Sequence, residues 1–323
     1  MSVLVVLEHD RGDIADAALQ ALTAARTLAG DTGCSLEAVA IGKGADSLVA
    51  IAAQYGVDSV HIATHDLLED YGADAWADCV VEAAASIDAE VVMAAGTDRG
   101  NEVMAQLAAR LDAPFVANCV VVEPEDPWVL TRVQWGGSLL ETVELQAEVK
   151  LLTMAEHSVL AEPSDSPSDP DVAEFEPDLD PSVLNTMICE REVVSAGIAL
   201  STAPVVVGGG RGVGSVDGFA ALDDLAGLLG GVVGCSRAVT NNGWRPHSDQ
   251  VGQTGTRIAP EIYIAAGISG AIQHWVGAKA SKRILAINTD AEANMVTKAD
   301  YAVIADLHKL VPAIAAEIRR RSS

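Results

Sequence analysis

Short apolar runs alternate with longer segments of helical periodicity along the first part of the chain. The runs have the length and β-branched content of buried strands, and the expected strands are 2–7, 36–41, 60–63 and 91–95. Ala and Leu recur at helical spacing between them, and the expected helices are 14–28, 46–55, 73–87 and 101–111. Because short connections join strand and helix in turn, this pattern predicts a doubly wound α/β domain with a parallel sheet.

A different pattern follows this alternation. The next extended segments are expected to close the first domain as antiparallel strands, and they are 116–122, 128–135, 139–145 and 147–152. Residues 162–181 contain five prolines, many acidic residues and few apolar ones, which predicts a mobile loop or linker. We expect residues 190–198 to return to the edge of the first domain.

The remainder of the chain again combines strands and helices. The expected strands are 205–207, 232–234, 262–266, 283–287 and 303–305, and the expected helices are 217–229 and 307–321. The sequence therefore predicts an α/β protein of two domains, 1–200 and 201–323, in which the second domain also has a parallel sheet.

Composition and charge narrow the classes of partner. Half of the residues are hydrophobic but only 4% are aromatic, which favours α/β layers over an aromatic-rich sandwich. The net charge is −26, from 46 acidic and 20 basic residues, so binding to nucleic acid or an anionic membrane surface is disfavoured. An acidic, lysine-poor surface is typical of proteins from salt-loving organisms, and an acidic mesophilic protein is the alternative.

Five scattered cysteines without a Cys-x-x-Cys motif argue against a disulfide scaffold, an iron–sulfur cluster or a zinc site. Reduced cytosolic thiols are the simplest explanation. The N-terminal residues show no basic region followed by a long apolar run, so we expect neither a signal peptide nor a membrane span. The expected location is the cytoplasm.

The stretch from Gln250 to Asn288 carries the most chemical information. A polar, Gly-rich run, 250–255, precedes the strand 262–266, and Gly267 ends that strand. Ser269 is placed to cap a helix containing Ala271, Ile272, Gln273 and His274, which would aim backbone N–H groups at an anion such as a pyrophosphate. The alternative is an ordinary βαβ unit with polar loops.

The residues in this stretch resemble a known family. The strings VGQTG (251–255), PEIYIAAGISGAIQH (260–274), AINTD (286–290) and ADYAVIADL (299–307) are similar to the C-terminal domain of the electron-transfer flavoprotein alpha subunit. VVVGGGRGVG (205–214) and CSRAV (235–239) fit the same family. The resemblance implies a nucleotide-binding-like first domain without nucleotide and a Rossmann-like, FAD-binding domain at 201–323.

Two arginines and a histidine are implied to contact the flavin. Arg211 would contact FAD, and Arg237 would lie against the isoalloxazine, where a cation favours the reduced, negatively charged ring. His274 would be a donor at the pyrimidine edge of the ring. Thr254 would donate its hydroxyl toward N5, and Gln250 and Gln253 would offer their amides to the ring or the ribityl chain.

The remaining implied FAD-binding positions surround these residues. They are Ser236, Val251, Gly252, Gly267, Ser269, Gly270, Ala271, Ile272, Gln273, Asn288, Asp306 and Leu307. The resemblance places Asn288, Asp306 and Leu307 toward the adenosine. The chain departs from the family pattern at 240–249 and at 293–295, and both segments flank the expected flavin.

As implied by the resemblance, the protein is an electron carrier and not an enzyme. A beta subunit would complete a heterodimer, mainly through the first domain. Flavin dehydrogenases would supply electrons, and a quinone reductase or a ferredoxin-like protein would accept them, with at most peripheral membrane contact. Two alternatives are an NAD-dependent enzyme related to sirtuins or deoxyhypusine synthase, and an adenine-nucleotide sensor binding near 96–100.

Three other motifs favour structural roles. The glycines at 208–214 do not have G-x-G-x-x-G spacing, because the third position is Ser215 or Val213, so they predict a turn. His61, His65 and Asp66 have metal-like spacing, but they lie at the end of a predicted strand and favour a loop. The run 96–100 precedes a helix and could hold phosphate, but we expect a structural or interface role. No Ser/His/Asp triad is evident.

Overall fold

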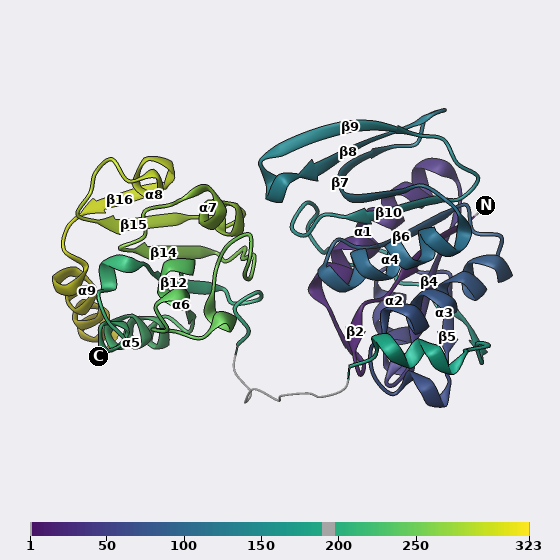
Figure 1. The fold of residues 1–323 in the computed structure, drawn as a ribbon, viewed down its shortest axis with the longest axis horizontal. Helices are drawn as coiled ribbons and strands as arrows, with labels where there is room; N and C mark the ends of the chain where they lie inside the picture. The colour runs from purple at the N-terminus through teal and green to yellow at the C-terminus, as the bar shows by residue number, and fades with distance from the viewer. Residues whose placement is uncertain (1, 189–197, 323) are drawn as a thin grey trace. The chain divides into compact units, whose positions relative to one another are not determined.

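The computed structural model describes residues 2–188 and 198–322, which form two compact units (Figure 1). Unit 1 is Met1–Val193 and unit 2 is Val194–Ser323. The domain boundary after residue 200 stays a prediction. The expected return of residues 190–198 to the first domain concerns residues that the structure does not describe, except for Ile198. Cys189 also lies outside the described residues.

A nine-stranded sheet forms the centre of unit 1 (Figure 1). Its strands in spatial order are β11 (Asp171–Phe175), β5 (Ser59–Ala63), β4 (Ser35–Ile41), β1 (Ser2–Val6), β6 (Val91–Ala95), β10 (Lys150–Met154), β7 (Phe115–Glu123), β8 (Trp128–Gln134) and β9 (Leu139–Leu145). The strands from β11 to β7 run parallel, and β8 and β9 are antiparallel. A short hairpin, β2 (His9–Asp10) and β3 (Asp13–Ile14), stands apart. The predicted parallel α/β fold is confirmed.

Helices cover both faces of this sheet. They are α1 (Asp16–Thr32), α2 (Val49–Gln54), α3 (Ala73–Ser86) and α4 (Asp98–Leu111). Successive residues of a strand face opposite sides, so Val3 and Val5 of β1 pack with α1, whereas Leu4 and Val6 pack with α3 and α4. This is why the central strands read as continuous apolar runs.

One expected antiparallel strand is parallel instead. Segments 128–135 and 139–145 form the antiparallel β8 and β9, as predicted, and segment 116–122 lies in β7, which is antiparallel to β8 but parallel to β10. The segment expected at 147–152 becomes β10, which lies between β6 and β7 and is parallel to both. The residues 151–154 are buried. Leu151 and Leu152 belong to the apolar clusters on opposite faces of the sheet, and burial on both faces favours a central, parallel position.

The acidic segment 162–181 is not the loop or linker that its composition predicted. Residues 171–175 form β11, which pairs in parallel with β5. Before it, the backbone N–H groups of Ser164 and Ser168 donate to the carbonyl oxygens of Gln54 and Ala53 at 2.7 and 2.9 Å. Pairing at a sheet edge uses backbone groups and does not require apolar side chains, so composition alone missed this strand.

Unit 2 contains a five-stranded parallel sheet (Figure 1). Its strands in spatial order are β13 (Val232–Cys235), β12 (Val205–Gly209), β14 (Ile262–Ala266), β15 (Ile284–Asn288) and β16 (Tyr301–Ile304). The helices are α5 (Ala220–Leu228), α6 (Arg237–Asn241), α7 (Ile272–Ala278), α8 (Asn294–Lys298) and α9 (Leu307–Ser322). The order reverses direction between β12 and β14, and doubly wound sheets bind ligands outside the carboxyl ends of strands at such a point.

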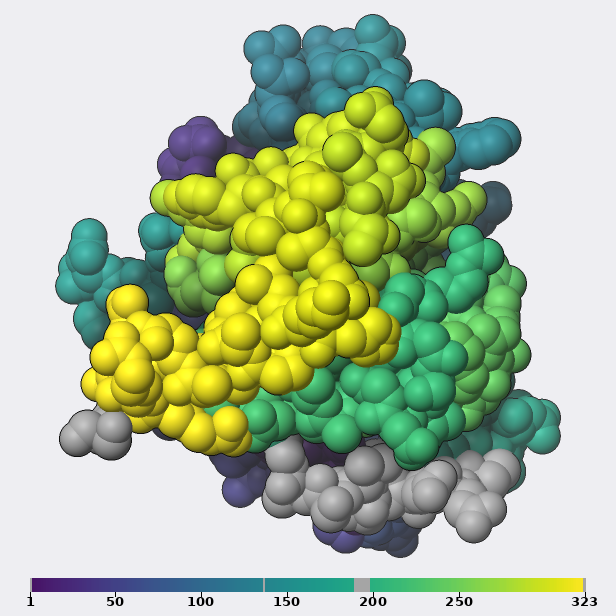
Figure 2. Space-filling model, turned by 90° about the vertical axis from the view of Figure 1, so that its left-hand side faces the viewer, coloured from purple at the N-terminus to yellow at the C-terminus, as the bar shows by residue number. Residues whose placement is uncertain are grey.

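The core of unit 2 lies on both faces of its sheet. On one face, Leu222 and Leu225 of α5 pack with Val311 of α9 and with Val207 of β12. On the other face, Tyr263 of β14 and the residues around it pack with α7. Figure 2 shows the C-terminal segments, in yellow, at the surface of this unit. No helix of the described residues has the length and apolar character needed to cross a membrane.

Candidate functional site

The carboxyl ends of the unit 2 strands meet at one edge of the sheet, because all five strands run parallel. Backbone hydrogen bonds join the loops that follow them. Gly210 N–H donates to the Ala266 oxygen at 2.9 Å, and Ser236 N–H donates to the Gly209 oxygen at 3.0 Å. This edge gathers predicted residues from all five loops, namely Arg211, Ser236, Arg237, Gly267, Ser269, Gly270, Asn288, Asp306 and Leu307.

The polar loop 250–255 joins the same edge. Its Val251 N–H donates to the oxygen of Cys235, the last residue of β13, at 2.9 Å. Its Gln253 N–H donates to the Gln273 oxygen in α7 at 2.8 Å. These two bonds bring the second group of predicted residues together, namely Gln250, Val251, Gly252, Gln253, Thr254, Ala271, Ile272, Gln273 and His274.

Arg211 and Arg237 are exposed, and neither side chain makes a hydrogen bond or an ion pair within the described residues. Arg245 of the same unit behaves differently, since it binds Asp223 at 3.2 Å and Asp249 at 2.8 Å. In a chain with 46 acidic residues, these two unpaired guanidinium groups add positive charge to the loops after the adjacent strands β12 and β13. Guanidinium groups bind phosphate and carbonyl oxygens with directed hydrogen bonds.

Gln250 has a different position from the one expected. Its side chain is 2% exposed, and Nε2 donates to both the carbonyl oxygen and Oγ1 of Thr254 at 3.0 Å. Its Oε1 accepts from the Thr240 hydroxyl at 2.7 Å. The amide is therefore occupied in holding the loop. Because Thr254 Oγ1 accepts this bond, the hydroxyl hydrogen of the exposed Thr254 is free to donate elsewhere.

The predicted cap at Ser269 is wrong. Helix α7 begins at Ile272, and its N-cap is Ala271, which makes no side-chain hydrogen bond to the helix. The backbone carbonyl oxygen of Ser269 accepts from Met295 N–H at 3.1 Å, and Gly270 has a φ of 75°. A left-handed residue at 270 interrupts the helical path, so the helix starts later than the Gly-Ser pattern suggested.

His274 is buried in the first turn of α7, with 6% of its surface exposed. Its Nε2 lies 2.7 Å from the hydroxyl oxygen of Tyr263. Burial lowers the pKa of His274 to about 4, so the ring is neutral at pH 7. The backbone of Val251 acts in the opposite direction and raises this pKa, but burial is the larger effect. Nδ1 is buried and has no hydrogen-bond partner within the described residues.

Two glycines let the loops after β12 and β14 approach closely. A Cβ atom on Gly210 would lie 2.1 Å from the Gly267 carbonyl oxygen. Gly267 itself has a φ of 65°, and a Cβ there would lie 2.7 Å from a methyl carbon of Leu307. Sequence reasoning included Gly267 but missed Gly210, because it interpreted the glycine run at 208–214 only as a turn.

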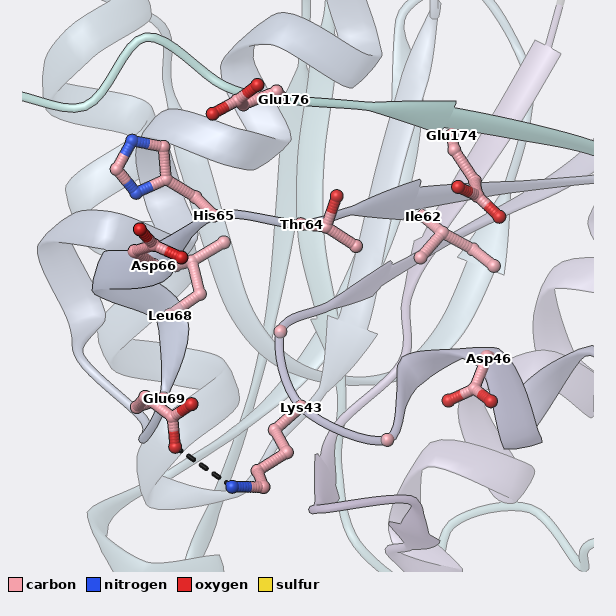
Figure 3. Close-up of a pocket in the computed structure, with 12 residues that line it drawn as sticks. Lys43, Asp46, Ile62, Thr64, His65, Asp66, Leu68, Glu69, Glu174 and Glu176 are labelled. Atoms are coloured by element: carbon pink, nitrogen blue, oxygen red, sulfur yellow. Dashed lines mark hydrogen bonds and ion pairs between the residues drawn. The ribbon is translucent and has the colours of Figure 1, made fainter.

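An open pocket of about 520 Å³ lies in unit 1, between the loops after β4 and β5 and the segment around β11 (Figure 3). Its lining carboxylates are Asp46, Asp66, Glu69, Glu174 and Glu176. Lys43 at its rim is paired with Glu69 at 3.0 Å. So many carboxylates repel phosphate, so this pocket does not suit a nucleotide.

The other motifs of unit 1 are structural. His61 bonds to Glu37 at 2.7 Å, and Nδ1 of His65 accepts from Leu67 N–H at 2.9 Å. No group of three or more metal-ligating side chains occurs among residues 2–188 and 198–322. In the run 96–100, Thr97 Oγ1 accepts from Gly100 N–H at 2.9 Å and caps α4.

The comparisons with known proteins cover most of the chain. A family model described as "Electron transfer flavoprotein domain" matches residues 3–180, and one described as "Electron transfer flavoprotein FAD-binding domain" matches residues 199–279. The "Electron transfer flavoprotein subunit alpha" of Bradyrhizobium diazoefficiens is 37% identical, and 98% of each chain is covered. The protein of the same name from Thermoanaerobacterium thermosaccharolyticum is 33% identical, again over 98% of each chain.

A third relative carries a different name. "Protein FixB" of Clostridium saccharobutylicum is 31% identical, over 98% of this chain and 96% of its own. These relatives give no support to an NAD-dependent enzyme or a nucleotide sensor.

Proposed function

Because the chain belongs to the electron-transfer flavoprotein alpha-subunit family, we propose that unit 2 binds FAD along the carboxyl edge of its five-stranded sheet. The bound FAD accepts and releases electrons. The chain itself binds and orients the cofactor and sets the charge around it. The protein is thus an electron carrier that catalyses no reaction on a substrate of its own.

The observation that carries this proposal is the pair of unpaired arginines at the carboxyl edge of the sheet, next to the point where the strand order reverses after β12. Arg211 follows β12 and Arg237 follows β13, so their loops are neighbours. Two guanidinium groups suit a ligand with phosphates at one end and electron-rich carbonyls at the other. The unsatisfied Nδ1 of the buried His274 adds a position for a ligand acceptor.

The contacting residues remain those predicted from the sequence, with one change of role. Arg237 and His274 serve the ring, Thr254 offers its free hydroxyl hydrogen, and Asp306 accepts from ribose hydroxyls. Gln250 positions the loop 250–255 instead of contacting the cofactor, since its amide is occupied by Thr240 and Thr254.

A beta subunit is the proposed partner, and unit 1 would supply most of the contact. The hairpin of β8 and β9 exposes large apolar side chains at its turn: Trp135 is 78% exposed, Leu139 55% and Leu140 70%. Aromatic and aliphatic groups clustered on a surface are typical of protein interfaces. Flavin dehydrogenases would supply electrons, and a quinone reductase or ferredoxin-like protein would accept them.

The proposed location is the cytoplasm, and the proposed source is a salt-loving organism. Cys34, Cys79, Cys119 and Cys235 are free thiols, as expected in a reducing compartment. The charge of −26 supports a protein adapted to a concentrated salt solution that screens its self-repulsion. Unfolding measured against salt concentration tests this, because a halophilic chain should gain stability with added salt.

FAD content and affinity test the central proposal. The full chain is purified with its coexpressed partner, and bound FAD is identified by its spectrum and mass. Arg211→Ala and Arg237→Ala should each weaken FAD binding about tenfold or more, as for a charged hydrogen bond. Arg283→Ala is the matched control, because Arg283 is exposed immediately before β15, at the opposite edge of the sheet.

A reductive titration of the same variants examines the ring. Loss of Arg237 should move the flavin potential to more negative values, since the cation stabilises the reduced ring. A colourless complex, or arginine variants that bind FAD as tightly as the control, would contradict the proposed site.

A further inference from the structure

Tyr263 and His274 form a buried pair that the family-derived contacts do not explain. Tyr263 lies in β14 and is 0% exposed, and His274 is in α7. Their rings are stacked, with centroids 6.0 Å apart and planes inclined by 29°, and the hydroxyl oxygen lies 2.7 Å from Nε2. The sequence pattern assigns Tyr263 no role beyond an apolar strand position.

The direction of the proton in this bond follows from the available partners. Within the described residues, the Tyr263 hydroxyl has no hydrogen-bond partner besides His274. If Tyr263 donates, Nε2 accepts and the neutral ring carries its proton on Nδ1. In that arrangement only the Nδ1–H is left without a partner within the described residues. If Nε2 donates instead, the Tyr263 hydrogen and the Nδ1 lone pair are both left buried without partners. A buried unsatisfied polar group is costly, so the first arrangement is favoured.

Both ionisation states support this arrangement. Burial raises the pKa of Tyr263 far above its usual value, so its hydroxyl keeps the hydrogen that it donates. Burial lowers the pKa of His274 to about 4, so the ring has one proton to place. The choice between the two ring nitrogens is therefore set by Tyr263.

Gly208 of β12 makes room for the Tyr263 hydroxyl. A Cβ atom on Gly208 would lie 2.2 Å from the hydroxyl oxygen and 2.7 Å from the ring carbon that carries it. A side chain at this position would displace the hydroxyl from His274. The absence of a side chain at 208 thus has a specific use, separate from the turn that follows the strand.

We propose that Tyr263 is a positioning residue that donates to Nε2 of His274 and holds its Nδ1 as a neutral N–H donor for an electron-rich carbonyl of the bound flavin. This inference rests on the proposed binding of FAD to unit 2. It adds that His274 is held in a single tautomer by Tyr263 of β14, whose hydroxyl fits beside Gly208 of β12. Such second partners commonly fix the tautomer of functional histidines.

The tautomer can be measured without flavin. Long-range proton–nitrogen NMR spectra of the full chain with 15N-labelled histidine distinguish the two ring nitrogens, and His274→Gln identifies the signals. In the wild-type chain near pH 7, Nδ1 should carry the proton. Tyr263→Phe should lower that Nδ1–H population, whereas Tyr71→Phe should not. Tyr71→Phe removes a buried hydroxyl, bonded to Glu102 at 2.9 Å, in unit 1.

A wild-type His274 protonated on Nε2 would overturn the proposal, and so would a Tyr263→Phe spectrum identical to that of the wild type. Because the tautomer is read from the wild-type chain and His274→Gln serves only to identify its signals, poor folding of Tyr263→Phe would not leave the question open. Gly208→Ala provides a second perturbation that keeps the Tyr263 hydroxyl but moves it, and it should lower the Nδ1–H population as well.

Flavin measurements then extend the test to function. In the complex, Tyr263→Phe should weaken FAD binding about three- to tenfold and shift the flavin potential to more negative values, while Tyr71→Phe leaves both unchanged. An unchanged affinity and potential in Tyr263→Phe would refute the donor role. If the wild-type complex holds no FAD, the proposed function fails, whereas the tautomer result still stands or falls by itself.

Discussion

Acidification should destabilise unit 2 through His274, and replacing this residue by Gln should remove that effect. In the unfolded chain, the pKa of His274 is near 6.5, whereas burial in the folded chain lowers its pKa to about 4. Between these values the unfolded chain binds a proton that the folded chain does not, so stability is lost as the pH falls. From pH 8 to pH 5.5, these two values correspond to a loss of about 1.4 kcal/mol.

Denaturant unfolding of the flavin-free chain at constant ionic strength measures this loss. The difference between wild type and His274→Gln cancels the other titrating groups, and the range stays above the isoelectric point near 4.4. His308→Gln is the matched control, because it removes an exposed histidine from the same unit. If His274→Gln loses stability between pH 8 and 5.5 as steeply as wild type, the burial argument is refuted.

Three further substitutions follow from the geometry. Gly210→Ala should lower the free energy of unfolding by roughly 2 kcal/mol or more and abolish FAD binding, because its Cβ would overlap the Gly267 carbonyl oxygen. Gly227→Ala, in open space on α5, is the control and should be neutral or stabilising by up to about 1 kcal/mol. Thermal unfolding of both variants checks this. Gln250→Ala should cost about 1–3 kcal/mol and weaken FAD binding, since the loop loses its buried amide, as unfolding and flavin titration would show. Trp135→Ser should weaken association with the beta subunit by about 2 kcal/mol or more without altering the unfolding of the isolated chain, and unchanged association would exclude this surface.

Local patterns predicted most elements because each one repeats at short range. The strands 91–95 and 262–266 were predicted with the bounds that the structure gives them, since uninterrupted apolar runs flanked by turns have few alternatives. The start of α7 was missed because a left-handed Gly270 and a bond to Met295 decide it. The strand β11 was missed because its stability comes from the backbone of β5 and not from its own side chains.

For the candidate site too, some properties could be predicted from the sequence and others depend on tertiary contacts. Resemblance supplied residues from five loops, and the parallel order of the strands explains why those loops share one edge. It could not indicate that Arg211 and Arg237 are unpaired or that the Gln250 amide is occupied, because each property depends on which distant residues lie nearby.

By itself, then, the sequence determined the α/β class, the family and the stretches that carry the chemistry, since periodicity and composition act through neighbours along the chain. Only the tertiary structure decided the parallel position of β10, the pairing of Tyr263 with His274 and the room that Gly208 leaves for it. Those features arise from contacts between strands and helices that are far apart in sequence. Burial in these contacts, and not local propensity, determines where protons are held and which side chains are free to bind a ligand.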